Sequence, residues 1–221
     1  MQVIYKRKEI KDLLKNLKKE KSIGFVPTMG ALHEGHISLL SRSVKENDFN
    51  VVSIFVNPTQ FNDKEDLKNY PRELEADLQK LKKAGCDLVF VPGEMEIYPE
   101  QDNRFFDLEG LDENMEGKSR KGHFNGVAQV VTKLFDIVMP TNAYFGEKDF
   151  QQLAIIRFLT KKLNYPINII GCPTLREKNG LAMSSRNQLL SADQKREAGN
   201  ISKTLFKSIE LSKNYNVEQV K

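Results

Sequence analysis

Cysteine and histidine are both scarce in this 221-residue sequence, and it has no long apolar run. The two cysteines, Cys86 and Cys172, are too few for a disulfide framework, and each adjoins an apolar run, so we expect buried thiols in a reducing cytosol. No apolar run approaches the roughly 20 residues needed to cross a bilayer, and residues 1–20 lack the core of a signal peptide. These absences predict a cytoplasmic protein with no membrane partner.

The composition is that of a soluble globular protein, with 39% hydrophobic and 29% charged residues. This length allows a substantial core in one large domain, or in one domain and a smaller one. The net charge of +4 permits an anionic substrate but does not by itself argue for nucleic acid. An amphipathic helix is expected over Arg7–Glu20, and its lysines are more typical of a solvated face than of an RNA-binding patch.

The stretch Pro27–His36 is the most informative part of the chain. It follows the apolar run Ile23–Val26, which predicts a buried strand, and it precedes apolar residues at helical spacing. His33 and His36 are three residues apart at the start of that helix, so both rings can meet one ligand. The free N–H groups and positive dipole of a helix N-terminus suit a phosphate. The pattern therefore indicates a nucleotide site.

A short His-x-x-His run is a weak signal alone, and it has two competing interpretations. The run could be incidental, although the remaining histidine, His123, also lies between glycines, at Gly122 and Gly126. A zinc site would need a further ligand, and neither the His-Glu-x-x-His pattern nor a paired-cysteine spacing is present.

Five apolar segments separated by helical patterns predict an α/β fold with a doubly wound parallel sheet of about five strands. The residues following these strands are polar. Asn57 and Gln60 follow one strand, and Lys148 and Asp149 follow another. Ligands bind at this edge of an open parallel sheet, so these residues are candidates for the site. The expected strands are Ile23–Val26, Asn50–Val56, Asp87–Pro92, Asn142–Gly146 and Pro166–Gly171, with a short additional strand near Arg104–Leu108.

Two loops complete the pattern. The segment Gly117–His123 is basic and is expected to be a flexible loop that suits an anion or a mobile cover. The segment Asn179–Arg186 contains two hydroxyls and an arginine behind a glycine, which is a plausible clamp for a polyphosphate. After it, Ser191 and Gln194 form a capping-box pattern for a last helix.

These segments together resemble the pantoate–β-alanine ligase family, the pantothenate synthetases. The family belongs with the nucleotidyltransferases related to class I aminoacyl-tRNA synthetases, so the resemblance implies a Rossmann-like domain. His33–His36 is similar to their His-x-Gly-His signature, and Met183–Arg186 is similar to their mobile Lys-Met-Ser-Lys-Ser loop. The segments that carry the resemblance, in the family's order, are Pro27–His36, Phe55–Phe61, Tyr70–Arg72, Gly122–Val127, Phe145–Gln152 and Gly180–Asn187.

The resemblance implies a two-step reaction. ATP and pantoate form an enzyme-bound pantoyl adenylate and release pyrophosphate, and the amine of β-alanine then displaces AMP. It also implies Mg²⁺ on the phosphates, with no protein ligand for the metal predicted, and a homodimer. The partners would then be small molecules, without nucleic acid.

Site residues follow from the same resemblance, position by position. The catalytic set is His33, His36, Lys148, Ser184, Ser185 and Arg186, with His36 at the position of the proton donor. The substrate-binding set is Met29, Asn57, Gln60 and Gln152, with the glutamines on pantoate and Gln60 also near β-alanine. The ATP-binding set is Met29, Gly30, Ala31, Leu32, His33, Glu34, Gly35, His36, Gly146, Glu147, Lys148, Asp149, Leu175, Met183, Ser184, Ser185 and Arg186.

The chain departs from the family's pattern at its C-terminal side. Residues 1–172 would form the nucleotide- and pantoate-binding domain, and residues 173–221 the mobile loop and the start of a truncated or abbreviated C-terminal domain. The family's fuller domain hinges over the site, so its shortening would expose the acyl adenylate to water.

Two other functions remain open from the sequence. One is a related enzyme that transfers a nucleotidyl group to a phosphorylated substrate, against which the uncharged Gln60 and Gln152 argue. The other is an RNA-binding module of synthetase-like fold, suggested only by the pI of 8.9 and the lysines of the first helix.

Overall fold

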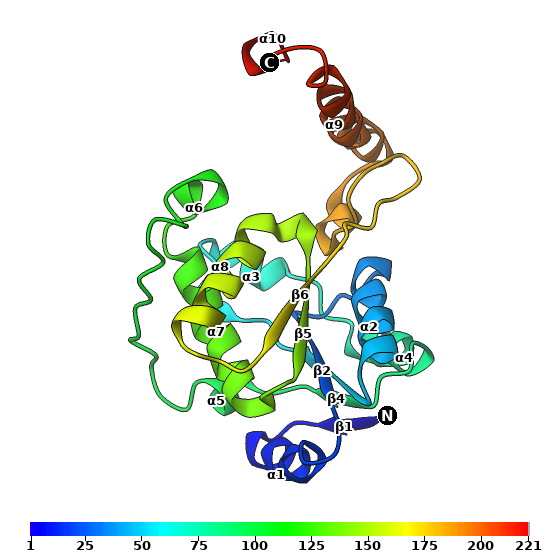
Figure 1. Cartoon of the computed structure of the whole chain (residues 1–221). Helices are drawn as coiled ribbons and strands as arrows, with labels where there is room; N and C mark the ends of the chain where they lie inside the picture. Colours follow the sequence, from blue (N-terminus) through cyan, green and yellow to red (C-terminus); the bar gives the residue numbers. More distant parts are fainter. Residues whose placement is uncertain (221) are drawn as a thin grey trace.

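A sheet of six parallel strands runs through the centre of the computed structural model, which describes residues 1–220 (Figure 1). Its strand order is β1-β4-β3-β2-β5-β6, and every neighbouring pair is parallel. The strands are β1 Gln2–Ile4, β2 Ile23–Thr28, β3 Phe49–Ile54, β4 Leu88–Phe90, β5 Asn142–Gly146 and β6 Asn168–Cys172.

Helices cover both faces of the sheet, as predicted for a doubly wound α/β fold. One apolar core packs α1, α7 and α8 against the sheet, and a second core packs α2 and α4 against the opposite face (Figure 1). The helices are α1 Arg7–Leu17, α2 Glu34–Glu46, α3 Lys64–Asn69, α4 Leu74–Lys83, α5 Glu94–Ile97, α6 Met115–Ser119, α7 His123–Val138, α8 Phe150–Lys162, α9 Ala192–Leu211 and α10 Val217–Val220. The short 3-10 helices are η1 Pro58–Gln60, η2 Glu147–Asp149 and η3 Ser185–Leu189.

The five expected main strands are present, and the expected total was one too low. The missed strand is β1, an edge strand of three residues whose first residue is exposed. So short an element shows neither the alternating pattern nor the continuous apolar run by which a strand is recognised.

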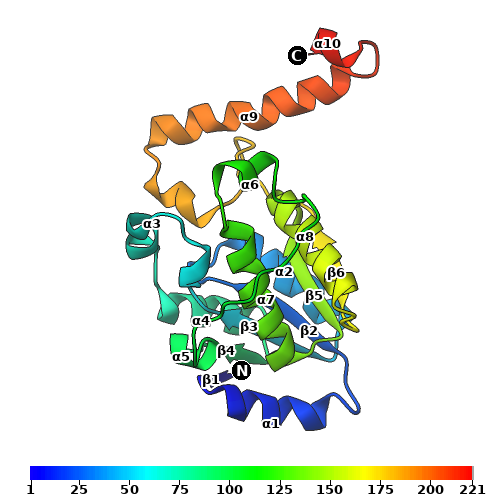
Figure 2. The ribbon, with the colours of Figure 1, turned by 90° about the vertical axis from the view of Figure 1, so that its left-hand side faces the viewer.

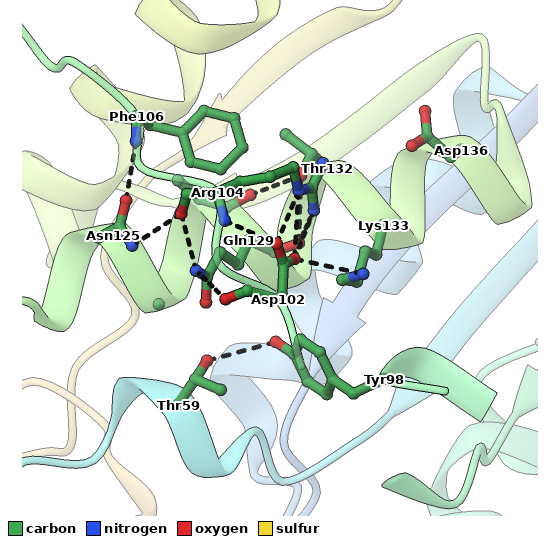
Figure 3. Close-up of polar contacts among 12 residues, drawn as sticks. Thr59, Tyr98, Asp102, Arg104, Phe106, Asn125, Gln129, Thr132, Lys133 and Asp136 are labelled. Atoms are coloured by element: carbon green, nitrogen blue, oxygen red, sulfur yellow. Dashed lines mark hydrogen bonds and ion pairs between the residues drawn. The ribbon is translucent and has the colours of Figure 1, made fainter. Parts of the chain in front are cut away.

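The additional strand expected near Arg104–Leu108 is absent, and residues 101–108 run as an irregular strap over α7. Side chains of α7 hold the backbone of this strap in place of a neighbouring strand (Figure 3). Gln129 donates to the carbonyl oxygens of Asp102 and Arg104, and Asn125 accepts from the Phe106 N–H. This segment therefore pairs with no strand, because its backbone N–H and C=O groups form their hydrogen bonds with side chains of a helix.

The basic segment Gly117–His123 is also more ordered than expected. Its first residues belong to α6, and a tight turn then leads into α7. Gln151 of α8 fixes this region, because its side chain accepts from the Gly117 N–H and donates to the carbonyl oxygens of Leu111 and Asn114. The segment lies at the mouth of the site described below.

Both cysteines are buried and unpaired, as expected, and burial raises the pKa of the Cys86 thiol to about 12. None of the helices within residues 1–220 is long and apolar enough to cross a membrane.

The last helices extend away from the sheet, and α9 lies across the end of the molecule above α6 (Figure 2). The predicted capping box is present: Ser191 accepts from the Gln194 N–H, and the Gln194 side chain accepts from the Ser191 N–H. The first half of α9 packs closely on the loop before it: a Cβ added at Gly199 would lie only 2.7 Å from the Asn179 carbonyl oxygen.

The strand order reverses beside β2, which pairs with β3 on one side and with β5 on the other. The connections after β2 and β5 leave in opposite directions, so a crevice opens between their carboxyl ends, where ligands bind in sheets of this kind. The segment Pro27–His36 covers the end of β2 and the loop after it, and Gly146–Asp149 covers the last residue of β5 and η2.

Candidate active site

A cavity of about 370 Å³ occupies this crevice, and a smaller one of about 160 Å³ lies against it. The two cavities have a common wall that includes Met29, His36, Gln60 and Gln152. Charged, hydroxyl and imidazole side chains make up half of the lining of the larger cavity and include three cations, whereas three valines and a leucine line the smaller one, which has no lysine or arginine. The arrangement suits a ligand pair in which one member is strongly polar and the other is partly apolar.

The two histidines of Pro27–His36 lie together, with ring centroids 4.1 Å apart. His33 is the N-cap of α2, and its Nδ1 accepts from the Gly35 N–H at 3.1 Å. His36 Nδ1 accepts from the His33 N–H at 3.3 Å. Because Nδ1 of each neutral ring is an acceptor, each Nε2 carries the proton and is a hydrogen-bond donor. Gly35 is required here, since a Cβ would come within 2.8 Å of the His33 ring.

Burial keeps both rings uncharged. It is the main cause of the lowered pKa of His33, and it lowers the pKa of His36 to about 3, with the neighbouring His33 and Lys148 acting in the same direction. Two neutral N–H donors therefore line the cavity, and the positive charge is supplied by other residues.

Side chains of α4 hold the loop that precedes His33. Gly30 and Ala31 both have positive φ, a conformation that is costly for alanine and easy for glycine. Asp77 of α4, which is 1% exposed, accepts from the Leu32 N–H at 2.8 Å, and Lys80 donates to the Leu32 carbonyl oxygen at 2.6 Å. These contacts fix the backbone just before His33.

The cations come from two other elements. Lys148 follows β5 and pairs with Asp149 at 2.8 Å, and both side chains border the larger cavity. Arg186 lies in η3, in the segment after β6, where it pairs with Asp66 of α3 at 2.8 Å and lies over the Tyr70 ring. Both cations are substantially exposed, so an anionic ligand can reach them.

The serines of the segment after β6 contact the loop that carries the two histidines. The buried Ser185 hydroxyl donates to the Ala31 carbonyl oxygen at 3.1 Å, and Ser184 caps η3 by accepting from the Arg186 N–H. Segments about 150 residues apart in the sequence therefore form one wall of the cavity.

The two glutamines on the common wall differ in their partners. Gln60 accepts from Asn57 Nδ2 through Oε1 and lies 3.1 Å from the Met29 sulfur through Nε2. The Gln152 side chain makes no hydrogen bond to any other residue of the described part of the chain and borders both cavities. The smaller cavity continues to an apolar end formed by Phe55, Val127, Val130, Val131 and Leu134.

Most of the residues proposed from the sequence meet here. Fourteen of them line the larger cavity, and Asn57 lines the smaller one. The fourteen are Met29, His33, Gly35, His36, Gln60, Gly146, Lys148, Asp149, Gln152, Leu175, Met183, Ser184, Ser185 and Arg186. Five proposed residues line neither cavity: Gly30, Ala31, Leu32, Glu34 and Glu147.

Other cavity residues were not in the proposed set. Arg120 and His123 line the larger cavity, and His123 Nδ1 lies 2.7 Å from the Gln60 carbonyl oxygen. The signal for them was the third histidine between two glycines. Tyr70 contributes an aromatic wall, with its ring 5.7 Å from that of Phe61. Its only sequence signal was the Tyr-Pro-Arg segment.

Comparison with known proteins agrees with this geometry. The family model described as pantoate-beta-alanine ligase matches residues 2–221. The chain belongs to the pantoate–β-alanine ligase family. It is therefore an enzyme of the ligase class.

Individual relatives are similar along almost the whole chain. A pantothenate synthetase from Phocaeicola vulgatus is 57% identical over 221 residues, which cover 99% of this chain and 78% of the relative. One from Bacteroides thetaiotaomicron is 54% identical over 220 residues, with the same coverage.

Solved structures of the family are similar in fold. The pantothenate synthetase from Thermus thermophilus superposes with a TM-score of 0.94 at 43% identity, over 100% of this chain and 79% of that one. The pantoate–β-alanine ligase from Francisella tularensis, solved in complex with β-γ ATP and β-alanine, has a TM-score of 0.87 at 44% identity, over 92% and 78% of the two chains.

Proposed function

We propose that this enzyme joins (R)-pantoate and β-alanine into pantothenate through a pantoyl adenylate, with release of pyrophosphate and AMP. The observation that carries the proposal is the pair of cavities with a common wall. One has the donors and cations that a triphosphate needs, and the other combines amide groups with an apolar end.

The larger cavity suits ATP. Neutral N–H donors from His33 and His36, cations from Lys148 and Arg186, and the serines of the loop after β6 face one space. A polyphosphate needs such a mixture, because charge-assisted hydrogen bonds hold its oxygens more strongly than neutral ones.

The smaller cavity suits pantoate, whose carboxylate and hydroxyls are polar and whose two methyl groups are apolar. Gln60 and Gln152 offer amide groups without charge, and Val130 and Val131 lie where the methyl groups would be buried. A phosphorylated acceptor would lack a cation here, which argues against the related nucleotidyltransferases.

In the first step, a pantoate carboxylate oxygen attacks the α-phosphorus of ATP, and the bond to the β-phosphate oxygen breaks. Negative charge grows on the phosphate oxygens and on the leaving pyrophosphate. Lys148 and Arg186 stabilise that charge, while the fixed N–H groups of His33 and His36 donate to the oxygens. The neutral state of His36 supports a role as hydrogen-bond donor.

In the second step, the uncharged amine of β-alanine attacks the acyl carbon of the adenylate, AMP departs with the electron pair of the broken bond, and the amine loses a proton. Gln60 lies on the wall between the two cavities, where the acyl carbon would be held. The protein contributes mainly position and orientation, since both reacting groups belong to the substrates.

The residues present fit an Mg²⁺ ion that arrives on ATP. No group of three His, Cys, Asp or Glu side chains within residues 1–220 could hold a metal, and Mg²⁺ is usually bound by phosphates, waters and only one or two carboxylates. Asp149, which borders the larger cavity and pairs with Lys148, is a carboxylate that could contribute. Bound Mg²⁺ would neutralise phosphate charge. The homodimer and the cytoplasmic location stay predictions from the resemblance and the composition.

The test is pyrophosphate release from ATP and Mg²⁺ with pantoate, measured with and without β-alanine. We expect release that depends on pantoate, pantothenate when β-alanine is added, and loss of both in His36→Ala. Release without pantothenate would show that only adenylation works in this chain. Absence of any pantoate-dependent release would contradict the proposal.

A further inference from the structure

Gln60 has a defined amide orientation, and that orientation decides what it can offer a substrate. Its Oε1 accepts from Asn57 Nδ2 at 3.1 Å. Its Nε2 therefore points the other way, toward the Met29 sulfur, which is a weak acceptor. The Gln60 amide consequently presents an N–H group, the half that attracts a carboxylate or hydroxyl oxygen.

Asn57 fixes this orientation and has no capacity left for a ligand. It is 1% exposed, and its Nδ2 donates to Gln60 Oε1 and to the Gly126 carbonyl oxygen. Its Oδ1 accepts from the Tyr98 hydroxyl at 2.8 Å, and the Thr59 hydroxyl lies 3.1 Å from the same oxygen. An amide has two donor hydrogens and two acceptor sites, so all four are used within the chain.

Tyr98 lies outside both cavities and approaches Asn57 from behind. It follows α5, its hydroxyl is directed at η1, and Figure 3 shows it reaching Thr59. The ring is held by Phe55 at 6.3 Å between centroids and by Lys133, whose Nζ lies 5.2 Å from the ring centre. Asp102, at the start of the strap over α7, pairs with Lys133 at 3.2 Å.

The Tyr98 hydroxyl remains a donor throughout the physiological range, because burial raises the pKa of Tyr98. Only 8% of the residue is exposed, so water does not readily replace it as a partner of Asn57. The position of this hydroxyl is set by the ring contacts, independently of any ligand.

We propose that Tyr98 is a positioning residue for the acid substrate: its hydroxyl holds Asn57, and Asn57 orients Gln60 so that its N–H faces pantoate. The inference rests on the proposed function, because it assigns the acid to the smaller cavity. It removes Asn57 from the residues that touch the substrate and adds a residue that lies behind them.

Without the hydroxyl, Asn57 Oδ1 keeps only Thr59, and the amides of Asn57 and Gln60 can rotate. A rotated Gln60 turns its Oε1 toward the substrate carboxylate, and the two oxygens repel. Binding of pantoate weakens, while the ATP contacts of His33 and Lys148 are unchanged.

The test is Tyr98→Phe, which keeps the ring and its contacts with Phe55 and Lys133. We expect the KM for pantoate to rise about three- to ten-fold, the usual effect of one lost buried hydrogen bond, with the KM for ATP within two-fold of wild type. The matched control is Tyr165→Phe, because the Tyr165 hydroxyl also binds a side chain, Asp136 of α7 at 2.8 Å, but lies outside both cavities. This control should leave both KM values unchanged.

A double-mutant cycle tests whether Tyr98 affects pantoate binding through Gln60. Gln60→Met keeps the size of the side chain and removes its amide, so adding Tyr98→Phe to it should change pantoate binding by less than two-fold. Thr59→Val removes the second hydroxyl at Asn57 Oδ1 and should raise the KM for pantoate in the same direction by a smaller factor. If Tyr98→Phe does not fold, the KM of Thr59→Val for pantoate tests the positioning role instead, and an unchanged value would overturn it.

The outcomes separate the two proposals. An active wild type with an unchanged KM for pantoate in Tyr98→Phe, or an equal rise in the Gln60→Met background, would overturn the positioning role and leave the ligase function standing. A wild type without pantoate-dependent pyrophosphate release would overturn the proposed function and this inference with it.

Discussion

Two loops border the larger cavity, and they are held in different ways. The loop before His33 is fixed from inside the protein by the buried Asp77, which accepts from the Leu32 N–H, and a partly exposed Lys80 donates to the Leu32 carbonyl oxygen. The loop that carries Arg186 is held by an ion pair with Asp66 whose partners are 46% and 36% exposed. The Ser185 hydroxyl adds one hydrogen bond between the loops.

The difference separates a preorganised part of the site from a part that can rearrange. Buried hydrogen bonds are costly to break, whereas an exposed ion pair contributes about 0–1 kcal/mol. The imidazoles can therefore wait in place for ATP, while Arg186 can exchange Asp66 for a phosphate. That Met183–Arg186 is mobile, as the resemblance implies, stays a prediction.

The largest effect is expected from the fixed loop itself. His36→Ala removes a preorganised donor and should lower kcat/KM for pantoate by about 100- to 1,000-fold, as loss of an oxyanion donor does elsewhere. Stability should change little, since the His36 ring borders a cavity. Steady-state kinetics and thermal unfolding measure the two quantities. A loss below ten-fold would show that the imidazole is not an important donor.

The support of that loop can be removed without touching the cavity. Asp77→Ala leaves the Leu32 N–H without its acceptor and should lower the free energy of unfolding by about 2 kcal/mol, together with kcat/KM. Asp77→Asn keeps an acceptor and should recover most of both, and Glu75→Ala, an exposed carboxylate on the same helix, should change neither. Equal effects of Asp77→Ala and Glu75→Ala would show that the loop does not depend on this support.

The neutral state of His36 has a consequence for pH dependence. Its pKa of about 3 lies far below the ordinary 6.5, so between these values the unfolded chain binds more protons than the folded one. Stability should therefore fall as the pH drops from 7 to 4.5. His36→Gln should flatten this dependence in chemical unfolding at several pH values. An unchanged slope would mean that His36 is not kept neutral by folding.

The smallest effect is expected at the exchangeable loop. Asp66→Ala frees Arg186 and should lower the KM for ATP about two-fold, with a change in unfolding free energy below about 1 kcal/mol. The control is Asp193→Ala, which removes the exposed ion pair between Asp193 and Arg196 on α9 and should leave the KM for ATP unchanged. A higher KM for ATP in Asp66→Ala would show that the ion pair assists binding instead of competing with it.

Much of the fold could be predicted from the sequence, because the buried strands are continuous apolar runs and the main helices have one apolar face. The elements that could not be predicted depend on tertiary contacts. The strand β1 exists because it pairs with β4, and the segment Arg104–Leu108 is not a strand because Gln129 and Asn125 hold its backbone.

The sequence could predict which residues meet at the site, but not their protonation or their hydrogen-bond partners. That His33, Lys148 and Arg186 meet follows from the edge at which parallel strands end. That His36 is neutral depends on burial, and that Asn57 has no free hydrogen-bonding group depends on Tyr98, which is 41 residues away in the sequence. Neither property has a local pattern.

The most direct test of the two-step reaction is isotope transfer from the acid. Pantoate labelled with ¹⁸O in its carboxylate is converted to pantothenate in the presence of ATP and β-alanine, and AMP is analysed by mass spectrometry. If the carboxylate attacks the α-phosphorus, one ¹⁸O atom passes to AMP in each turnover. Formation of ADP and of labelled inorganic phosphate, with no label in AMP, would contradict the adenylate and indicate an acyl phosphate instead.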